Sequence, residues 1–240
     1  MTRSEHYAPG KRLDVHVPRR AADVPVVLLW HGSGPDEADA LASLAADLAA
    51  RGVVALVPDW QSDDFTAGRA QLRASMAFAR AEAPSLGADP ERIVLAGWSL
   101  GANAAAHVGL RPELADGWSP AAVVGLGGSY TGSPFGDDVF AGAPGRDTAT
   151  TGGPVLLVHG TVDHLVPVER SVVAASRFTG LGWTTGLHEV ATDHAGVIGT
   201  RYDRARRRCV PTDDPARIGV RHEVADLIAG VALGGPPVRR

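Results

Sequence analysis

The chain has 240 residues, of which 45% are hydrophobic and 21% are charged, and its formal net charge is -4. This length predicts one α/β domain over residues 1–240, and the mildly acidic balance gives no reason to expect a nucleic-acid or anionic-membrane partner. One cysteine excludes an intrachain disulfide, and the lack of an apolar leader or a membrane-length apolar run favours a cytoplasmic protein.

Short apolar segments alternate with amphipathic segments along the chain. Residues 11–17 alternate apolar and polar side chains, which predicts a half-exposed edge strand. Apolar runs predict buried strands over 24–30, 53–57, 93–96, 121–126 and 154–159, and residues 183–190 are expected to form the last central strand. Helices are expected over 37–51, 66–83, 100–110, 168–178 and 214–233, with Thr66 as the cap of the second. The alternation predicts a mostly parallel, doubly wound sheet of six to eight strands with helices on both faces.

The segment 97–101, read Gly-Trp-Ser-Leu-Gly, lies between a predicted strand and a predicted helix and matches G-x-S-x-G. A sharp strand-to-helix turn holds its central serine, Ser99, in a strained conformation and lifts the side chain clear of the sheet. The flanking residues must be small for the turn to close, which suits Gly97 and Gly101. The alternative is a glycine-rich structural turn with an idle serine, but the strand and helix around it favour a nucleophile.

Ligands of parallel sheets bind beyond the carboxyl ends of the strands, so the groups just after each strand are informative. Ser99 follows one strand, and the segment 31–34, His-Gly-Ser-Gly, follows another. Asp163 and His194 follow two later strands. Their order along the chain is Ser, Asp, His, the order expected when G-x-S-x-G forms a nucleophile elbow.

From about residue 11 to residue 233, the chain resembles the α/β-hydrolase superfamily, and within it the small, capless esterases near the dienelactone hydrolases. The elbow at Ser99, the His31-Gly32 pair and the segment from Asp163 to Pro167 carry the resemblance. Dienelactone hydrolases use a cysteine nucleophile, whereas this chain has serine, which points to a generic carboxylic ester. The N-terminal part is short for a full eight-stranded sheet, so six or seven strands are expected.

Chemical roles follow for the catalytic triad. His194 would accept the proton of Ser99 and donate it to the leaving group, and Asp163 would fix the tautomer of His194 and stabilise its charged form. The backbone N–H groups of Leu100 and Ser33 would form the oxyanion hole. Ser33 is implied by the resemblance, in which the second donor lies just after the His-Gly pair, with Gly34 as the alternative.

Other residues compete for these roles. Asp193, Asp137 and Asp138 are rival acids, although the family order favours Asp163. His31 is expected to tie a loop, while the remaining histidines lie within a helix, a strand or a loop. No metal-binding spacing such as H-E-x-x-H occurs, so neither a metal nor a cofactor is expected.

Clues to the substrate are few. Trp98, Tyr130 and Trp60 lie near predicted strand ends, where they could bind a substrate. Residues 129–153 are rich in glycine and too short for a helical cap domain, which predicts a flexible flap over an open site. The five arginines within 201–208 could bind a carboxylate, a phosphate or a coenzyme A portion. Nearby aspartates favour a solvated excursion instead, and Cys209 beside it is expected to be inert.

The sequence therefore predicts a serine hydrolase that cleaves a carboxylic ester of a small or moderately sized substrate through an acyl-enzyme. A thioesterase or acyltransferase of secondary metabolism would use the same triad, and a non-catalytic binding protein is a third alternative. The expected partner is a small-molecule ester.

Overall fold

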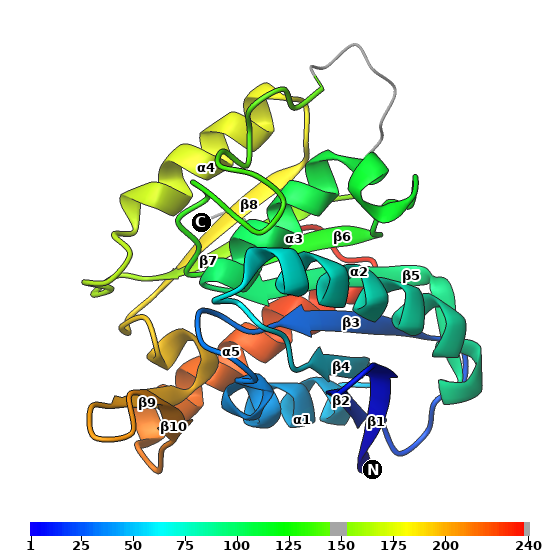
Figure 1. Ribbon diagram of the computed structural model, residues 1–240. Helices are drawn as coiled ribbons and strands as arrows, with labels where there is room; N and C mark the ends of the chain where they lie inside the picture. The colour runs from blue at the N-terminus through cyan, green and yellow to red at the C-terminus, as the bar shows by residue number, and fades with distance from the viewer. Residues whose placement is uncertain (145–152, 238–240) are drawn as a thin grey trace.

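The computed structural model describes residues 1–144 and 153–237. Eight strands of these residues form one sheet in the order β1-β2-β4-β3-β5-β6-β7-β8 (Figure 1). The six strands from β4 to β8 in this order are parallel, whereas β2 is antiparallel to both β1 and β4. The strands are β1 (Thr2–Ala8), β2 (Lys11–His16), β3 (Val24–Trp30), β4 (Val54–Pro58), β5 (Ala88–Trp98), β6 (Ala122–Leu126), β7 (Val155–Gly160) and β8 (Thr185–Val190).

The N-terminal edge of the sheet differs from the prediction. Strand β1 was not predicted, so the sheet has eight strands where six or seven were expected, and β2 is an inner strand instead of the edge. At the opposite edge lies β8, which was expected to be a central strand. The side chains of β1 are mostly polar and exposed, so its sequence has no apolar periodicity to reveal it. The pairing partner shields β2, whose Leu13 and Val15 are fully buried.

Helices cover both faces of the sheet. The face with α2 (Phe65–Glu82), α3 (Leu100–Leu110) and α4 (Glu169–Gly180) is opposite the face with α1 (Ala42–Ala50) and α5 (Pro215–Ala232) (Figure 1). Alternate residues of each inner parallel strand, β3 to β7, enter the two hydrophobic clusters under these helices, which is why these strands read as continuous apolar runs. No helix of the described residues is both long and apolar enough to cross a membrane.

The helix starts are largely as predicted, with two shifts. Helix α2 is capped by Asp64, whose carboxylate accepts from the N–H groups of Thr66 and Ala67, so Thr66 is not the cap. The segment predicted as one helix over 37–51 begins as a 3-10 turn, η1 (Ala38–Leu41), before α1. Further 3-10 turns are η2 (Pro84–Leu86), η3 (Pro112–Ala115) and η4 (Gly196–Ile198).

Two segments extend from the main sheet and its helices near the carboxyl ends of the strands. Strands β9 (Thr200–Asp203) and β10 (Arg208–Pro211) form a separate two-stranded sheet after β8 (Figure 1). The predicted flap, residues 129–153, includes residues 145–152, which lie outside the described residues. Its described part contacts the body of the domain: Arg111 donates to the carbonyl of Val139 at 2.8 Å, and Phe140 packs edge-on against Phe178 of α4.

Candidate active site

Ser99 occupies the sharp turn between β5 and α3. Its φ of 55° and ψ of -117° lie in a region that side chains rarely adopt, and its N–H donates to the carbonyl of Leu126 on β6 at 2.8 Å. A Cβ atom on Gly97 would lie 2.1 Å from the carbonyl oxygen of Gly101, and one on Gly101 would lie 2.3 Å from that of Trp30. Both glycines are therefore required for the strand and helix to approach so closely.

Two backbone N–H groups near Ser99 donate no hydrogen bond to any described residue. Leu100 is the first residue of α3, and its N–H has no acceptor among the described residues. The same holds for the N–H of Ser33 within residues 1–144 and 153–237. The N–H of Gly34, by contrast, donates to the hydroxyl of Ser62 at 2.6 Å. The structure thus leaves Ser33, not Gly34, with a donor to offer beside the elbow.

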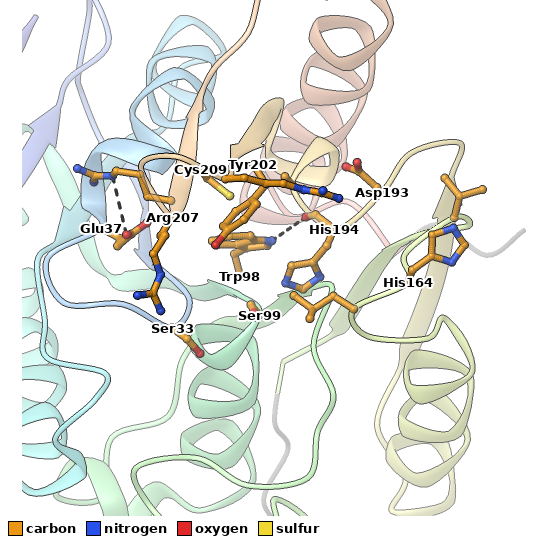
Figure 2. Close-up of a pocket in the computed structure, with 15 residues that line it drawn as sticks. Ser33, Glu37, Trp98, Ser99, His164, Asp193, His194, Tyr202, Arg207 and Cys209 are labelled. Atoms are coloured by element: carbon orange, nitrogen blue, oxygen red, sulfur yellow. Dashed lines mark hydrogen bonds and ion pairs between the residues drawn. The ribbon is translucent and has the colours of Figure 1, made fainter.

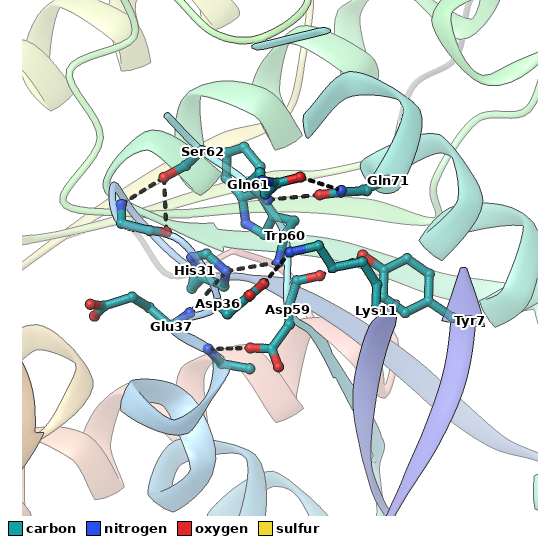
Figure 3. Close-up of polar contacts among 12 residues, drawn as sticks. Tyr7, Lys11, His31, Asp36, Glu37, Asp59, Trp60, Gln61, Ser62 and Gln71 are labelled. Atoms are coloured by element: carbon teal, nitrogen blue, oxygen red, sulfur yellow. Dashed lines mark hydrogen bonds and ion pairs between the residues drawn. The ribbon is translucent and has the colours of Figure 1, made fainter. Parts of the chain in front are cut away.

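The loop that carries Ser33 is held by His31 (Figure 3). The N–H groups of Trp60 and Glu37 donate to His31 Nε2 at 3.2 and 3.3 Å, so Nδ1 carries the proton and donates to the Gly32 carbonyl at 2.9 Å. Complete burial lowers the pKa of His31 to about 4, which keeps the ring neutral and Nε2 an acceptor. These bonds fit the loop-tying role that the sequence suggested for His31.

His194 and Asp163, from the segments after β8 and β7, meet at the same edge of the sheet. Asp163 Oδ2 accepts from His194 Nδ1 at 2.6 Å, while Oδ1 accepts from the N–H groups of Leu165 and Val166 at 2.9 and 2.8 Å. His159 Nε2 lies 3.4 Å from Oδ2. Burial opposes ionisation of Asp163, but hydrogen bonds from His159, His194 and Val166 outweigh it and hold its pKa well below its usual range.

None of the rival acids contacts His194. Asp193 forms a bidentate pair with Arg217, with both N–O distances 2.7 Å, and accepts from the N–H of Gly196. Asp137 is exposed, and Asp138 lies 3.7 Å from Arg177 on α4. Of the four carboxylates considered from the sequence, the structure brings only Asp163 to the imidazole.

The other histidines near these elements have partners of their own. His107 Nδ1 is 2.9 Å from the hydroxyl of Ser133, and His188 Nε2 is 2.7 Å from Glu223. No group of three or more His, Cys, Asp or Glu side chains within the described ranges could hold a metal ion.

Ser99, His194 and Ser33 line one cavity of about 590 Å³ (Figure 2). Trp98 forms part of its wall: its ring centroid is 5.1 Å from that of His194, and its indole N–H donates to the His194 carbonyl at 3.0 Å. The Ser99 hydroxyl has no hydrogen-bond partner among the described residues. Ser99, His194 and Ser33 thus border one space, while Asp163 bonds His194 from outside the lining residues and Leu100 directly follows Ser99 in the chain.

The predicted substrate-binding residues divide into two groups. Trp98 lines the cavity, but Trp60 and Tyr130 are not among its lining residues and are 0% and 4% exposed. Both belong to the cluster under α2, α3 and α4, whereas Trp98 belongs to the cluster on the opposite face. Trp60 stacks on His31 instead. Closeness to a strand end therefore did not identify the face on which a side chain packs.

Most of the remaining cavity wall was not identified from the sequence as part of a pocket. It comes from the residue before η1, the loop after β7, the loop after β8 and the β9–β10 hairpin: Glu37, Val162, His164, Leu165, Asp193, Ala195, Tyr202, Arg204, Arg207, Arg208 and Cys209. Of these residues, only the arginines within 201–208 gave a signal in the sequence that could have indicated a binding site. They were interpreted from the sequence as facing solvent. The hairpin instead folds back over the cavity (Figure 2).

Comparisons with known proteins inform the fold. No protein-family model matches the chain, and no curated protein matches it. Among solved structures, the apo form of Thermogutta terrifontis esterase 2 has a TM-score of 0.77 at 18% identity, covering 99% of this chain and 97% of that one. The propionate-bound thermophilic esterase Est2 of that planctomycete gives 0.76 at 18% identity, covering 100% and 97%. Esterase 2 phosphorylated by paraoxon gives 0.77 at 18%, covering 99% and 96%. The chain has the α/β-hydrolase fold, as predicted.

Proposed function

We propose that this protein is a serine hydrolase that cleaves carboxylic esters of small or moderately sized substrates through an acyl-enzyme. The observation that carries the proposal is the bond between His194, which lines the same cavity as the elbow serine, and Asp163, which lies behind the imidazole with its Oδ2 2.6 Å from Nδ1. A carboxylate-bound imidazole beside a strained, unpartnered serine is the arrangement that nucleophilic catalysis requires.

In the proposed reaction, the Ser99 oxygen attacks the ester carbonyl while its proton passes to His194 Nε2. Asp163 accepts from Nδ1–H, which keeps Nε2 free to take that proton and stabilises the imidazolium. The negative charge on the carbonyl oxygen is met by the N–H groups of Leu100 and Ser33. His194 then protonates the leaving alcohol, and a water molecule activated by the same imidazole hydrolyses the acyl-enzyme.

The structural neighbours support this reading of the site. Esterase 2 of Thermogutta terrifontis is described as an esterase, has been observed with propionate bound, and is phosphorylated by paraoxon. Within the family we place this chain with the small esterases that resemble dienelactone hydrolases but use serine. Cys209 is not a rival nucleophile, because burial raises the pKa of its thiol to about 11 and keeps it protonated at neutral pH.

The direct test is labelling with a fluorophosphonate probe, followed by mass mapping of the adduct. We expect one adduct, on Ser99, and parallel loss of activity toward para-nitrophenyl esters. Ser99→Ala should retain its circular dichroism spectrum and lose both labelling and turnover, while Cys209→Ala should be labelled like the wild type. An adduct on Cys209, or wild-type turnover by Ser99→Ala, would refute the assignment. A thioester panel run alongside separates the thioesterase alternative, which would show higher kcat/KM on thioesters than on matched esters.

A further inference from the structure

The β9–β10 hairpin concentrates positive charge beside the catalytic cavity of a chain whose net charge is -4. Residues 201–208 contain five arginines and one aspartate. That aspartate, Asp203, lies within 3.9 Å of Arg201 and 3.8 Å of Arg206. Neither of these two arginines lines the cavity. Their charges are therefore partly balanced on the outer side of the hairpin.

The other arginines of the hairpin lie on the cavity wall. Arg208 contacts Glu37 at 3.8 Å and Asp39 at 2.5 Å, so it has acidic partners. Arg204 and Arg207 also line the cavity, and neither has a carboxylate within 4 Å among the described residues. Figure 2 shows the Arg207 side chain directed into the cavity toward Ser33, on the side of the proposed oxyanion hole.

Neither acid on the cavity wall lies within 4 Å of these two guanidinium groups. Asp193 pairs with Arg217 at 2.7 Å, and Glu37 lies 3.8 Å from Arg208, a partner that it shares with Asp39. The two free cations therefore face the space in which a substrate of Ser99 would lie. A guanidinium offers several N–H donors in a planar fork that fits a carboxylate or a phosphate.

Another part of the cavity wall is apolar. Val162, Leu165 and Tyr202 line it and are 52%, 74% and 56% exposed. Together with Trp98, these side chains form a wall suited to a hydrocarbon or aromatic body. A ligand that satisfies both parts of the mouth has an apolar body and an anionic end.

We propose that Arg204 and Arg207 form an anion subsite that selects esters bearing a carboxylate or similar oxyanion group remote from the scissile bond. The inference rests on the proposed function, since it names the substrate class of the same site. The anion belongs either to the acyl part or to the alcohol part of the ester, and matched substrates distinguish the two.

The test uses pairs of esters that differ only in one masked charge. For the acyl part, para-nitrophenyl hydrogen adipate is compared with its methyl ester, and for the alcohol part, para-acetoxybenzoate is compared with its methyl ester. The measured quantity is the ratio of kcat/KM for the charged and the neutral member of each pair. In the wild type we expect a ratio above one for one pair, which identifies the part that carries the anion.

The double variant Arg204→Gln/Arg207→Gln should lower that ratio about tenfold, a typical effect of losing a charge-assisted contact at a partly exposed site. Raising the salt concentration to about 1 M, where the Debye length is about 3 Å, should lower the wild-type ratio in the same direction. Arg206→Gln is the matched control: it removes a neighbouring arginine of the same hairpin that does not line the cavity, and should keep the wild-type ratio.

A binding measurement separates this inference from the proposed function. In the Ser99→Ala background, calorimetric affinity for methyl hydrogen adipate should exceed that for dimethyl adipate, and the double arginine substitution should abolish the difference. Binding that follows the arginines without any ester turnover would sink only the hydrolase proposal. Equal ratios and equal affinities in the wild type and the double variant, or the same loss in Arg206→Gln, would overturn the anion subsite.

Discussion

Replacing Asp163 with asparagine tests the triad most sharply, because the change alters one oxygen and leaves the shape of the side chain intact. Oδ1 of Asp163 anchors the loop after β7 by accepting from the N–H groups of Leu165 and Val166. An asparagine can keep both bonds with its own oxygen. Its NH₂ group then occupies the place of Oδ2, facing His194 Nδ1 and close to His159 Nε2.

The expected consequences follow from this exchange of acceptor for donor. An NH₂ group at 2.6 Å from His194 Nδ1 favours the tautomer with the proton on Nε2, which cannot accept the proton of Ser99. Turnover should fall by up to about four orders of magnitude, about 5.5 kcal/mol in activation free energy. KM should change little, because Asp163 does not line the cavity. Loss of a buried charge-assisted bond should reduce the free energy of unfolding by about 1–3 kcal/mol.

The assay is steady-state hydrolysis of para-nitrophenyl butyrate, with urea unfolding and circular dichroism to confirm that each variant is folded. Asp193→Asn, Asp137→Asn and Asp138→Asn are the controls and should each retain turnover within about tenfold, since none of these carboxylates contacts His194. A folded Asp163→Asn enzyme that keeps its rate would refute the reasoning, as would a larger loss at any control position.

Three further predictions concern other parts of the structure. Because the pKa of His31 is lowered to about 4 in the folded protein, the unfolded chain takes up this proton at a higher pH than the folded protein does. The stability that the neutral His31 contributes is therefore present above about pH 6.5 and is lost as the pH falls toward 4. The urea midpoint should drop between pH 7 and pH 5 by an amount equivalent to about 2 kcal/mol, and an unchanged midpoint would contradict this. Gly101→Ala should destabilise the fold by about 2–3 kcal/mol and abolish turnover, whereas Gly219→Ala, where a Cβ meets nothing within 4 Å, should be neutral or slightly stabilising in thermal melts. Trp98→Ala should raise KM for bulky esters severalfold, because Trp98 lines the cavity. Trp60→Phe should leave KM unchanged and lower only the melting temperature, because Trp60 is buried away from the cavity. A KM change of similar size in both variants would mean that the cavity wall is misassigned.

The parts of the molecule that the sequence predicted are those with a strong local signal. Strands β3 to β7 are apolar on both faces, so their runs are visible without any knowledge of partners. The elbow was visible because steric closeness demands glycine on both sides of Ser99. The strand-end rule placed Asp163 and its rivals at one edge of the sheet, and the chain order Ser, Asp, His of the resembled family favoured Asp163, which the structure joins to His194.

The parts that were missed depend on contacts distant in the chain. Strand β1 is held by its pairing with β2, and its own side chains are too polar to signal a strand. The two faces of the sheet cannot be told apart from one sequence, so Trp60 was grouped with Trp98 although the two pack on opposite sides. The hairpin arginines were interpreted as solvated because nothing local shows that the hairpin folds back over the cavity.

The separateness of that hairpin has a consequence for how this protein can change. Strands β9 and β10 pair with each other as a sheet of their own, while the proposed nucleophile, base and acid follow strands of the eight-stranded sheet. Insertions or substitutions within residues 203–208 therefore leave the hydrogen-bond ladder of the main sheet intact. The part of the wall that discriminates among substrates is in this sense modular, so that a lineage, or a protein engineer, can exchange the hairpin and retune selectivity without rebuilding the reaction centre.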